Sequence, residues 1–487
     1  MTTSEKRSSA AVILSLREGS RHSAVGRRNS KTLTRLKMTT VLSSAILAPL
    51  FSDDEISKLL SDAAFMRALV EVEIALAHAE ARIGVIPTDA AEQISHVRAE
   101  KIDIPALVTG TARSGFPIIA LVQELRKQVS SDAAPYVHWG ATTQDIMDTA
   151  CVLQLRGAAE LFTSRLAEII RNLSALASTH RHTVLAGRTH SQQALPITFG
   201  LKVAAWLAPL LRHLQRLEEI LPRLLVVQFG GAAGTLAALG DRGLAVTEEL
   251  AKELQIGVPA MPWHAQRDSF VEFAGWLSLV TGSLGKMAQD IILMAQTEVG
   301  EVGESAEQGR GGSSTMPQKS NPITSELIVA AARTNAALLS GMHQAQIQEH
   351  ERATHGWQVE WLTLPQMITL TGAALKHALY LAKNMQADTN MMRANISRAN
   401  DVILAEAAVF ALAKAMPRQQ AEELVKKACA AAVAENTTLI GVVERLAGDS
   451  VKKGEVDWQA LARPENYLGA TDEIINQVLT RAEKFLR

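Results

Sequence analysis

The sequence has few aromatic residues and few cysteines. Aromatic side chains make up only 4% of the 487 residues, and the two cysteines are Cys151 and Cys429. Two cysteines cannot build a disulfide framework, so the composition favours a reducing compartment, and we expect the cytoplasm. With so few aromatic residues, the apolar core has to come mainly from alanine and leucine, which are strong helix formers.

The sequence also lacks an excess of either charge and lacks a long apolar run. Its formal net charge is −1, so nothing indicates a basic surface, and we expect no nucleic-acid partner. No apolar stretch reaches the roughly 18 residues that a membrane-spanning helix requires, and we expect no membrane partner. Hydrophobic residues still make up 47% of the chain, which is enough for a large buried core.

Three common site signatures are missing as well. Lys319 follows Gln318 where a phosphate-binding P-loop would have glycine. His350 and His355 are five residues apart, so they lack the four-residue spacing with which two histidines on one helix face bind zinc. No G-x-S-x-G turn is present to expose a nucleophilic serine. We therefore expect no metal and no simple serine hydrolase.

Apolar residues recur every three or four positions over most of the chain after about residue 50. The longest such segments are 152–176, 201–224, 270–297 and 324–348. Pro209 should bend the second segment, and Pro222 should bend or end it. Apolar stripes of this length need partner helices, so we expect an all-α fold built around a long helical bundle.

Changes in composition suggest how the chain is divided. Residues 1–37 are rich in arginine and serine and poor in acidic residues, which is typical of a transit peptide or of a disordered leader ahead of a true start at Met38. We expect an N-terminal helical domain over 38–150 and a central bundle over 151–383. A smaller, alanine-rich C-terminal helical domain should cover 384–487.

Two of the loops between these segments carry residues that could act in binding or catalysis. Residues 130–145 place His138, Thr142, Thr143 and Gln144 ahead of a helix, where hydroxyl and N–H groups could bind a carboxylate or could simply cap the helix. Residues 185–200 contain His190. A histidine can act as an acid or base near neutral pH, but a structural role is the more common one.

A third loop, "GRGGSSTMPQKSNP" at residues 309–322, contains Ser313, Ser314, Lys319 and Asn321. Its glycines and prolines exclude regular helix or strand. Such a loop is either a tolerated linker or a functional site.

These three loops resemble known motifs. Residues 312–322, "GSSTMPQKSNP", resemble the signature of the fumarase/aspartase superfamily, and "HWGATTQD" and "GRTHSQQ" resemble its two preceding regions in order and spacing. Further stretches are similar to the bacterial 3-carboxy-cis,cis-muconate cycloisomerases, namely "PRLLVVQFGGAAGTLAALG", "PWHAQRDSFVEFA" and "QEHERATHGWQVEWLTLP". The resemblance extends from about Ala48 to the C-terminus. It implies a three-domain helical subunit, a homotetramer with a twenty-helix core, and active sites formed by loops of three subunits.

The resemblance also implies roles for individual residues. Ser313 matches the catalytic base, assisted by Lys319 and the amide groups of its loop. His190 matches the second-region histidine, and Glu326 falls where a glutamate partners it, which would favour the cationic form of the ring. The implied substrate-binding residues are His138, Thr142, Thr143, Gln144, Ser314, Asn321, Arg267 and Arg352. The last two arginines could equally form interface salt bridges.

The implied reaction interconverts 3-carboxy-cis,cis-muconate and 4-carboxymuconolactone. A proton moves at the carbon next to one carboxylate while another carboxylate of the substrate adds or leaves, so we expect a small polycarboxylate substrate and no cofactor. His190 leaves an alternative open, because some bacterial cycloisomerases carry tryptophan at that position. The alternative is a C–N lyase that releases fumarate from adenylosuccinate or another N-succinyl amine. A non-catalytic helical scaffold would not need the set of polar residues described above.

Overall fold

The computed structural model describes residues 42, 44–305, 311–312, 315–316 and 318–486. The predicted leader (1–37), Ser313 and Ser314 lie outside this part of the chain. The prediction of an all-α fold is confirmed, because the described residues form mainly helices and two short two-stranded sheets. No helix among the described residues is long and apolar enough to cross a membrane.

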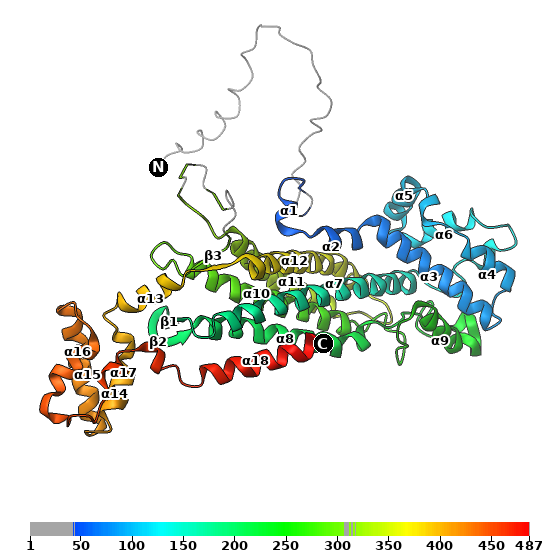
Figure 1. Ribbon diagram of the computed structural model, residues 1–487. Helices are drawn as coiled ribbons and strands as arrows, with labels where there is room; N and C mark the ends of the chain where they lie inside the picture. Colours follow the sequence, from blue (N-terminus) through cyan, green and yellow to red (C-terminus); the bar gives the residue numbers. More distant parts are fainter. Residues whose placement is uncertain (1–41, 43, 306–310, 313–314, 317, 487) are drawn as a thin grey trace, which may run out of the picture. The chain divides into compact units, whose positions relative to one another are not determined.

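Within residues 45–487, five long helices pack side by side and form a central bundle (Figure 1). They are α7 (Thr143–Thr179), α8 (Phe199–Leu224), α10 (Asp268–Met294), α11 (Ile323–Ala345) and α12 (Gly356–Asn384). The first four contain the segments predicted from the apolar spacing, to within a few residues at each end. In α7 the apolar stripe is fully buried at Phe162, Leu166, Ile169, Ile170 and Leu173. α8 continues through Pro209 and ends at Leu224, two residues beyond Pro222.

A second core lies beside the start of α7. Its helices are α3 (Asp62–Arg82), α4 (Thr88–Ser95), α5 (Ile104–Ser114), α6 (Ile118–Arg126) and α9 (Gly243–Leu254). The short helices α1 (Ala48–Phe51) and α2 (Asp54–Leu59) pack against α12. α9 lies between α8 and α10 in the sequence, yet it packs on α3.

A third core contains the alanine-rich C-terminal helices. They are α13 (Thr389–Ser397), α14 (Ala405–Leu412), α15 (Arg418–Ala434), α16 (Leu439–Ala447) and α17 (Trp458–Leu461). The last helix, α18 (Thr471–Leu486), returns along α8 and α7. The domain boundaries at 150 and 383 stay predictions.

The segment 185–200, which the sequence predicted to be a loop, is a β-hairpin. β1 (Val184–Thr189) pairs antiparallel with β2 (Gln192–Thr198), from Val184↔Thr198 to Thr189↔Gln192. The turn residues His190 and Ser191 have φ values of 48° and 64°, the pair of positive angles that favoured two-residue hairpin turns require. A smaller sheet joins β3 (Val302–Gly303) to β4 (Gln386–Ala387).

Candidate active site

The predicted site residues lie at opposite ends of α7. Thr142 and Thr143 are at the start of this helix, whereas His190 is on the hairpin that follows its end. α7 has 37 residues, and at about 1.5 Å per residue it is roughly 55 Å long. One subunit therefore does not bring Thr142 and His190 into one site.

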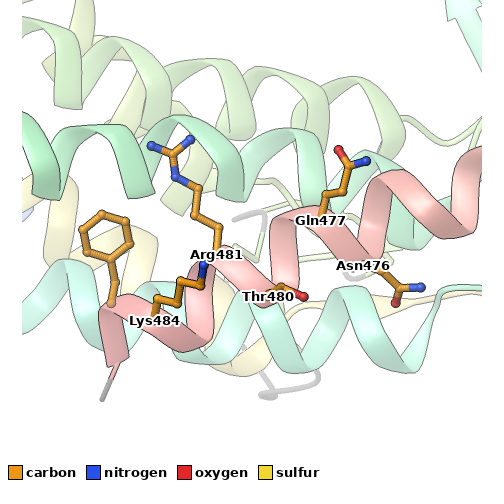
Figure 2. Close-up of a pocket in the computed structure, with 6 residues that line it drawn as sticks. Asn476, Gln477, Thr480, Arg481 and Lys484 are labelled. Atoms are coloured by element: carbon orange, nitrogen blue, oxygen red, sulfur yellow. The ribbon is translucent and has the colours of Figure 1, made fainter.

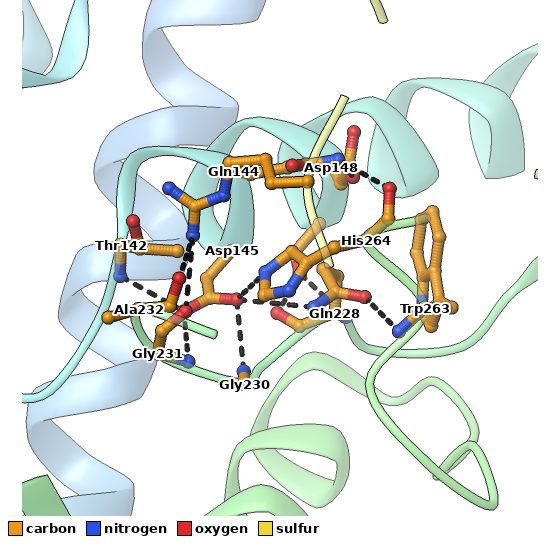
Figure 3. Close-up of polar contacts among 12 residues, drawn as sticks. Thr142, Gln144, Asp145, Asp148, Gln228, Gly230, Gly231, Ala232, Trp263 and His264 are labelled. Atoms are coloured by element: carbon orange, nitrogen blue, oxygen red, sulfur yellow. Dashed lines mark hydrogen bonds and ion pairs between the residues drawn. The ribbon is translucent and has the colours of Figure 1, made fainter. Parts of the chain in front are cut away.

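Asp145 is the centre of the polar network at the start of α7 (Figure 3). Its side chain is almost completely buried and accepts five hydrogen bonds. The donors are the N–H groups of Thr142 (3.0 Å), Gly230 (3.0 Å) and Gly231 (2.9 Å), Nε2 of Gln228 (3.2 Å) and Nε2 of His264 (2.7 Å). One carboxylate thus joins three segments: the loop before α7, the glycine loop (227–232) and residues 262–268.

The glycine loop is held from its other side as well. The carbonyl and the N–H of Gln228 both bond the hydroxyl of Thr149 at 3.0 Å, and Oε1 of Gln228 accepts from the N–H of Trp263 at 2.7 Å. Nη2 of Arg352 donates to the carbonyls of Gly231 (3.2 Å) and Ala232 (3.0 Å). The structure therefore places Arg352, a predicted substrate-binding residue, directly on the glycine loop.

Gln144, also predicted to bind substrate, points into the protein. Its side chain is 1% exposed, and Nε2 donates to Oδ2 of Asp148 and to the carbonyl of His264, both at 3.0 Å. Oε1 of Gln144 has no hydrogen-bond partner among the described residues. The structure brings Gln144 to the network, as it does Thr142 and Arg352.

Arg267 lies in a buried ion triad with Asp148 and Glu360. Nη1 and Nη2 of the arginine contact Oδ2 and Oδ1 of Asp148 at 2.7 and 3.1 Å, while Nε and Nη2 contact Oε1 and Oε2 of Glu360 at 2.8 and 2.6 Å. The rings of Trp263 and Phe270 lie 4.8 and 4.7 Å from its guanidinium carbon. Burial alone would lower the pKa of Arg267, but the two carboxylates outweigh burial and hold the pKa above its ordinary value. The sequence left substrate binding or an interface ion pair open for Arg267, whereas the structure places it in an ion triad inside one subunit.

The hairpin at the other end of α7 is held by a second buried carboxylate. Both oxygens of Glu301 contact Arg188 of β1, at 2.8 and 2.7 Å, and Oε1 also accepts from Nδ2 of Asn395 at 2.9 Å. His190 is exposed at the tip of this hairpin. Glu326, its predicted partner in the first turn of α11, is exposed too. No hydrogen bond or ion pair joins these two described side chains within one subunit.

The described ends of the signature loop form a narrow neck. The N–H of Asn321 donates to the carbonyl of Gly311 at 2.8 Å, and Gly312 pairs with Ser320. Lys319 is exposed beyond this neck. Glu304 accepts from the N–H groups of Thr324 (3.0 Å) and Ser325 (2.6 Å), which caps α11. The neck is thus followed directly by the capped start of α11.

Substitution of Gly311 by alanine should open this neck. Gly311 has φ 71°, and an added Cβ would lie 2.3 Å from the carbonyl oxygen of Asn321, so the paired backbone has to separate. We expect kcat/KM to fall by about tenfold or more, which corresponds to a loss of about 1.4 kcal/mol in transition-state binding. Gly303→Ala is the matched control, since its Cβ would meet nothing within 4 Å. Equal kinetics for both variants would contradict this role of the neck.

Sequence reasoning missed several buried polar residues that position the site. Asp145 could have been found from the Thr-x-x-Asp spacing of residues 142–145, which resembles a capping box. Gln228, His264, Glu301 and Glu304 have partners that are distant in the sequence or that belong to the backbone, and no local pattern points to them.

A separate surface hollow of about 640 Å³ lies along α18 (Figure 2). It is lined by residues of that helix alone, including Asn476, Thr480, Arg481 and Lys484. None of the predicted site residues lines this hollow. The side chains that line it belong to one helix and do not form a buried network like the one around Asp145.

The structure thus defines an α-helical subunit in which a long bundle carries polar residues at both of its ends and buried carboxylates brace the loops there. The lyase family matches residues 51–334, and the family described as adenylosuccinate lyase C-terminus matches residues 401–478. The chain belongs to the lyase family, within the fumarase/aspartase superfamily.

Named relatives cover nearly the whole chain. The 3-carboxy-cis,cis-muconate cycloisomerase of Acinetobacter baylyi is 43% identical over 90% of this chain and 99% of its own length. Trans-aconitate decarboxylase 1 of Mycosarcoma maydis is 38% identical, with coverage of 90% and 89%. The crystal structure of the 3-carboxy-cis,cis-muconate lactonizing enzyme from Pseudomonas putida matches with a TM-score of 0.84 and 39% identity, covering 90% of this chain and 99% of that one.

Proposed function

We propose that this protein is a 3-carboxy-cis,cis-muconate cycloisomerase. The observation that carries the proposal is the 43% identity to a relative of that name over 99% of the relative's length. In the proposed reaction, a carboxylate oxygen of the substrate adds to one end of a carbon–carbon double bond. One proton, taken up from solvent, is delivered to the carbon next to another carboxylate, which gives a lactone with one negative charge fewer than the substrate and consumes no water.

Ser313 is the proposed proton carrier, and Lys319 together with loop amides stabilises the charge that develops on the carboxylate. Arg352, held at the glycine loop, and the hydroxyls of Thr142 and Thr143 are the proposed carboxylate-binding groups at the start of α7. His190 is the proposed second-region residue, with Glu326 beside it in the assembled enzyme.

A spectroscopic assay with three substrates tests the proposal. Loss of the diene absorbance of 3-carboxy-cis,cis-muconate, with formation of 4-carboxymuconolactone, is the expected result. Release of fumarate from adenylosuccinate without any diene loss would instead assign a C–N lyase, the alternative that His190 leaves open. Release of carbon dioxide from trans-aconitate alone would assign the activity for which the Mycosarcoma maydis relative is named.

We further propose that the enzyme works in the cytoplasm as a homotetramer whose active sites combine loops of different subunits. The separation of Thr142 from His190 along α7 supports this, as does the exposure of His190 and Glu326. Thr142→Val and Ser313→Ala subunits should each be nearly inactive alone. Mixtures refolded together should regain part of the activity, because some mixed sites then hold no substituted residue. A mixture as inactive as its components would contradict shared sites.

A further inference from the structure

Glu73 and His138 form a buried pair beside the network of Asp145. Glu73 lies on α3 with its side chain 1% exposed, and its Oε1 is 2.7 Å from Nδ1 of His138, whose side chain is 17% exposed. His138 lies in the loop before α7, four residues ahead of Thr142, with φ 67°. Nε2 of His138 has no hydrogen bond to any described residue. One ring nitrogen is therefore bound to the protein, and the other is left for a ligand.

The Glu73 carboxylate determines what that second nitrogen can do. Because a carboxylate only accepts, Nδ1 of His138 must carry a proton. In the neutral ring Nε2 would then be an acceptor, and in the cationic ring it is a donor. A polycarboxylate needs a donor, so the site requires the cationic ring.

The charges around His138 favour that form. Burial alone would lower the pKa of His138, and Arg126 of α6 acts in the same direction. The charge and hydrogen bond of Glu73 from α3, with the charge of Asp145 from α7, outweigh both, so the pKa lies above its ordinary value. The three elements around the loop thus leave the ring more readily protonated.

A second acid on the same face of α3 does not provide negative charge for the His138 ring. Glu80 is seven residues, about two helical turns, beyond Glu73. It is 0% exposed, and neither of its carboxyl oxygens has a partner among the described residues. Burial first, and the charge of Glu73 second, raise its pKa to about 9. Glu80 is therefore uncharged near neutral pH, and Glu73 provides the negative charge on this face.

We propose that Glu73 is a positioning residue that orients His138 and keeps its Nε2–H directed at a carboxylate of the substrate. The substrate class in this inference rests on the proposed function. Glu73 itself acts only through the ring and does not touch the substrate.

The test compares Glu73→Gln with Glu80→Gln and His138→Gln. The first removes the charge but keeps an oxygen that can accept from Nδ1, while the second replaces an uncharged group by an uncharged one. Binding of tricarballylate, an unreactive tricarboxylate, is measured by calorimetry between pH 6 and pH 8.5, together with kcat and KM. In the wild type, affinity should fall as the pH rises through the pKa of His138.

In Glu73→Gln this fall should move to lower pH, so KM should rise severalfold, most strongly at pH values above the wild-type transition. The value of kcat should change far less. Glu80→Gln should follow the wild-type curve, and His138→Gln should show no such step. A wild-type curve for Glu73→Gln, or an equal shift for Glu80→Gln, would overturn the proposal.

A ligand-free measurement separates this inference from the proposed function. Since the pKa of His138 is raised above the ordinary 6.5, the pair stabilises the fold fully below pH 6.5 and loses this effect as pH rises through the raised pKa. A double-mutant cycle of Glu73→Gln and His138→Gln should therefore show coupling in melting temperature at pH 6 that weakens by pH 9. Absent coupling overturns the pair itself. Coupling without tricarballylate binding in the wild type overturns the polycarboxylate role and counts against the proposed substrate, while the lactone assay tests that substrate directly.

Discussion

Arg267→Met should lower the free energy of unfolding by about 3–5 kcal/mol, the typical loss when one partner of a buried ion pair is removed. The substitution leaves the side chains of Asp148 and Glu360, which are 3% and 4% exposed, without their counter-charge. It also removes the cation that lies against Trp263 and Phe270. Thermal unfolding followed by circular dichroism measures the effect.

Arg223→Met is the matched control. Arg223 also contacts both oxygens of one glutamate, Glu272, at 3.0 and 2.6 Å, but this pair is exposed and should contribute little. The triple variant Arg267→Met, Asp148→Asn, Glu360→Gln should recover much of the lost stability, because no unpaired charge remains buried. Equal melting temperatures for the two single variants would show that the triad does not stabilise the subunit.

Ser313→Ala should lower kcat on 3-carboxy-cis,cis-muconate by about 10²–10⁴-fold, the range that removal of a general acid or base produces. The value of KM should change little, since Ser313 acts on the proton and not on the binding carboxylates. In D2O, product that carries deuterium at the carbon next to the carboxylate should form more slowly than with the wild type. Steady-state kinetics and mass spectrometry measure both effects.

The adjacent Ser314→Ala is the control for this result. Ser314 is a predicted binding residue, so its loss should raise KM more than it lowers kcat. If Ser314→Ala removed turnover and Ser313→Ala did not, the two serines would have exchanged roles. Melting temperatures of both variants should stay near that of the wild type.

The long helices could be predicted from the sequence because their burial is periodic. A stripe at three- and four-residue spacing, such as Leu166, Ile169, Ile170 and Leu173, can be buried only if the segment is helical and has a partner. The hairpin at 184–198 escaped prediction. Its turn uses His190 and Ser191 at positive φ, where the usual hairpin signal would be asparagine or glycine.

Some residues of the candidate site could also be predicted from the sequence. Motif spacing and the resemblance of the loops to the superfamily pointed to His138, Thr142, Arg352 and the signature loop, although capping or other structural roles also fitted these residues. The same motif reasoning grouped Arg267 with them. The structure instead gives Arg267 two buried carboxylate partners, at sequence separations of 119 and 93 residues.

The sequence by itself therefore determined the helical class, the approximate helix limits, the loops proposed to carry the chemistry and the resemblance to one superfamily. These depend on side-chain periodicity and on residues close together in the chain. Only the tertiary structure decided that Asp145 joins three loops, that Glu73 holds His138, and that Thr142 and His190 lie at opposite ends of α7. The physical reason is that a buried polar group must find a partner wherever packing brings one near, and no local pattern in the chain encodes that distance.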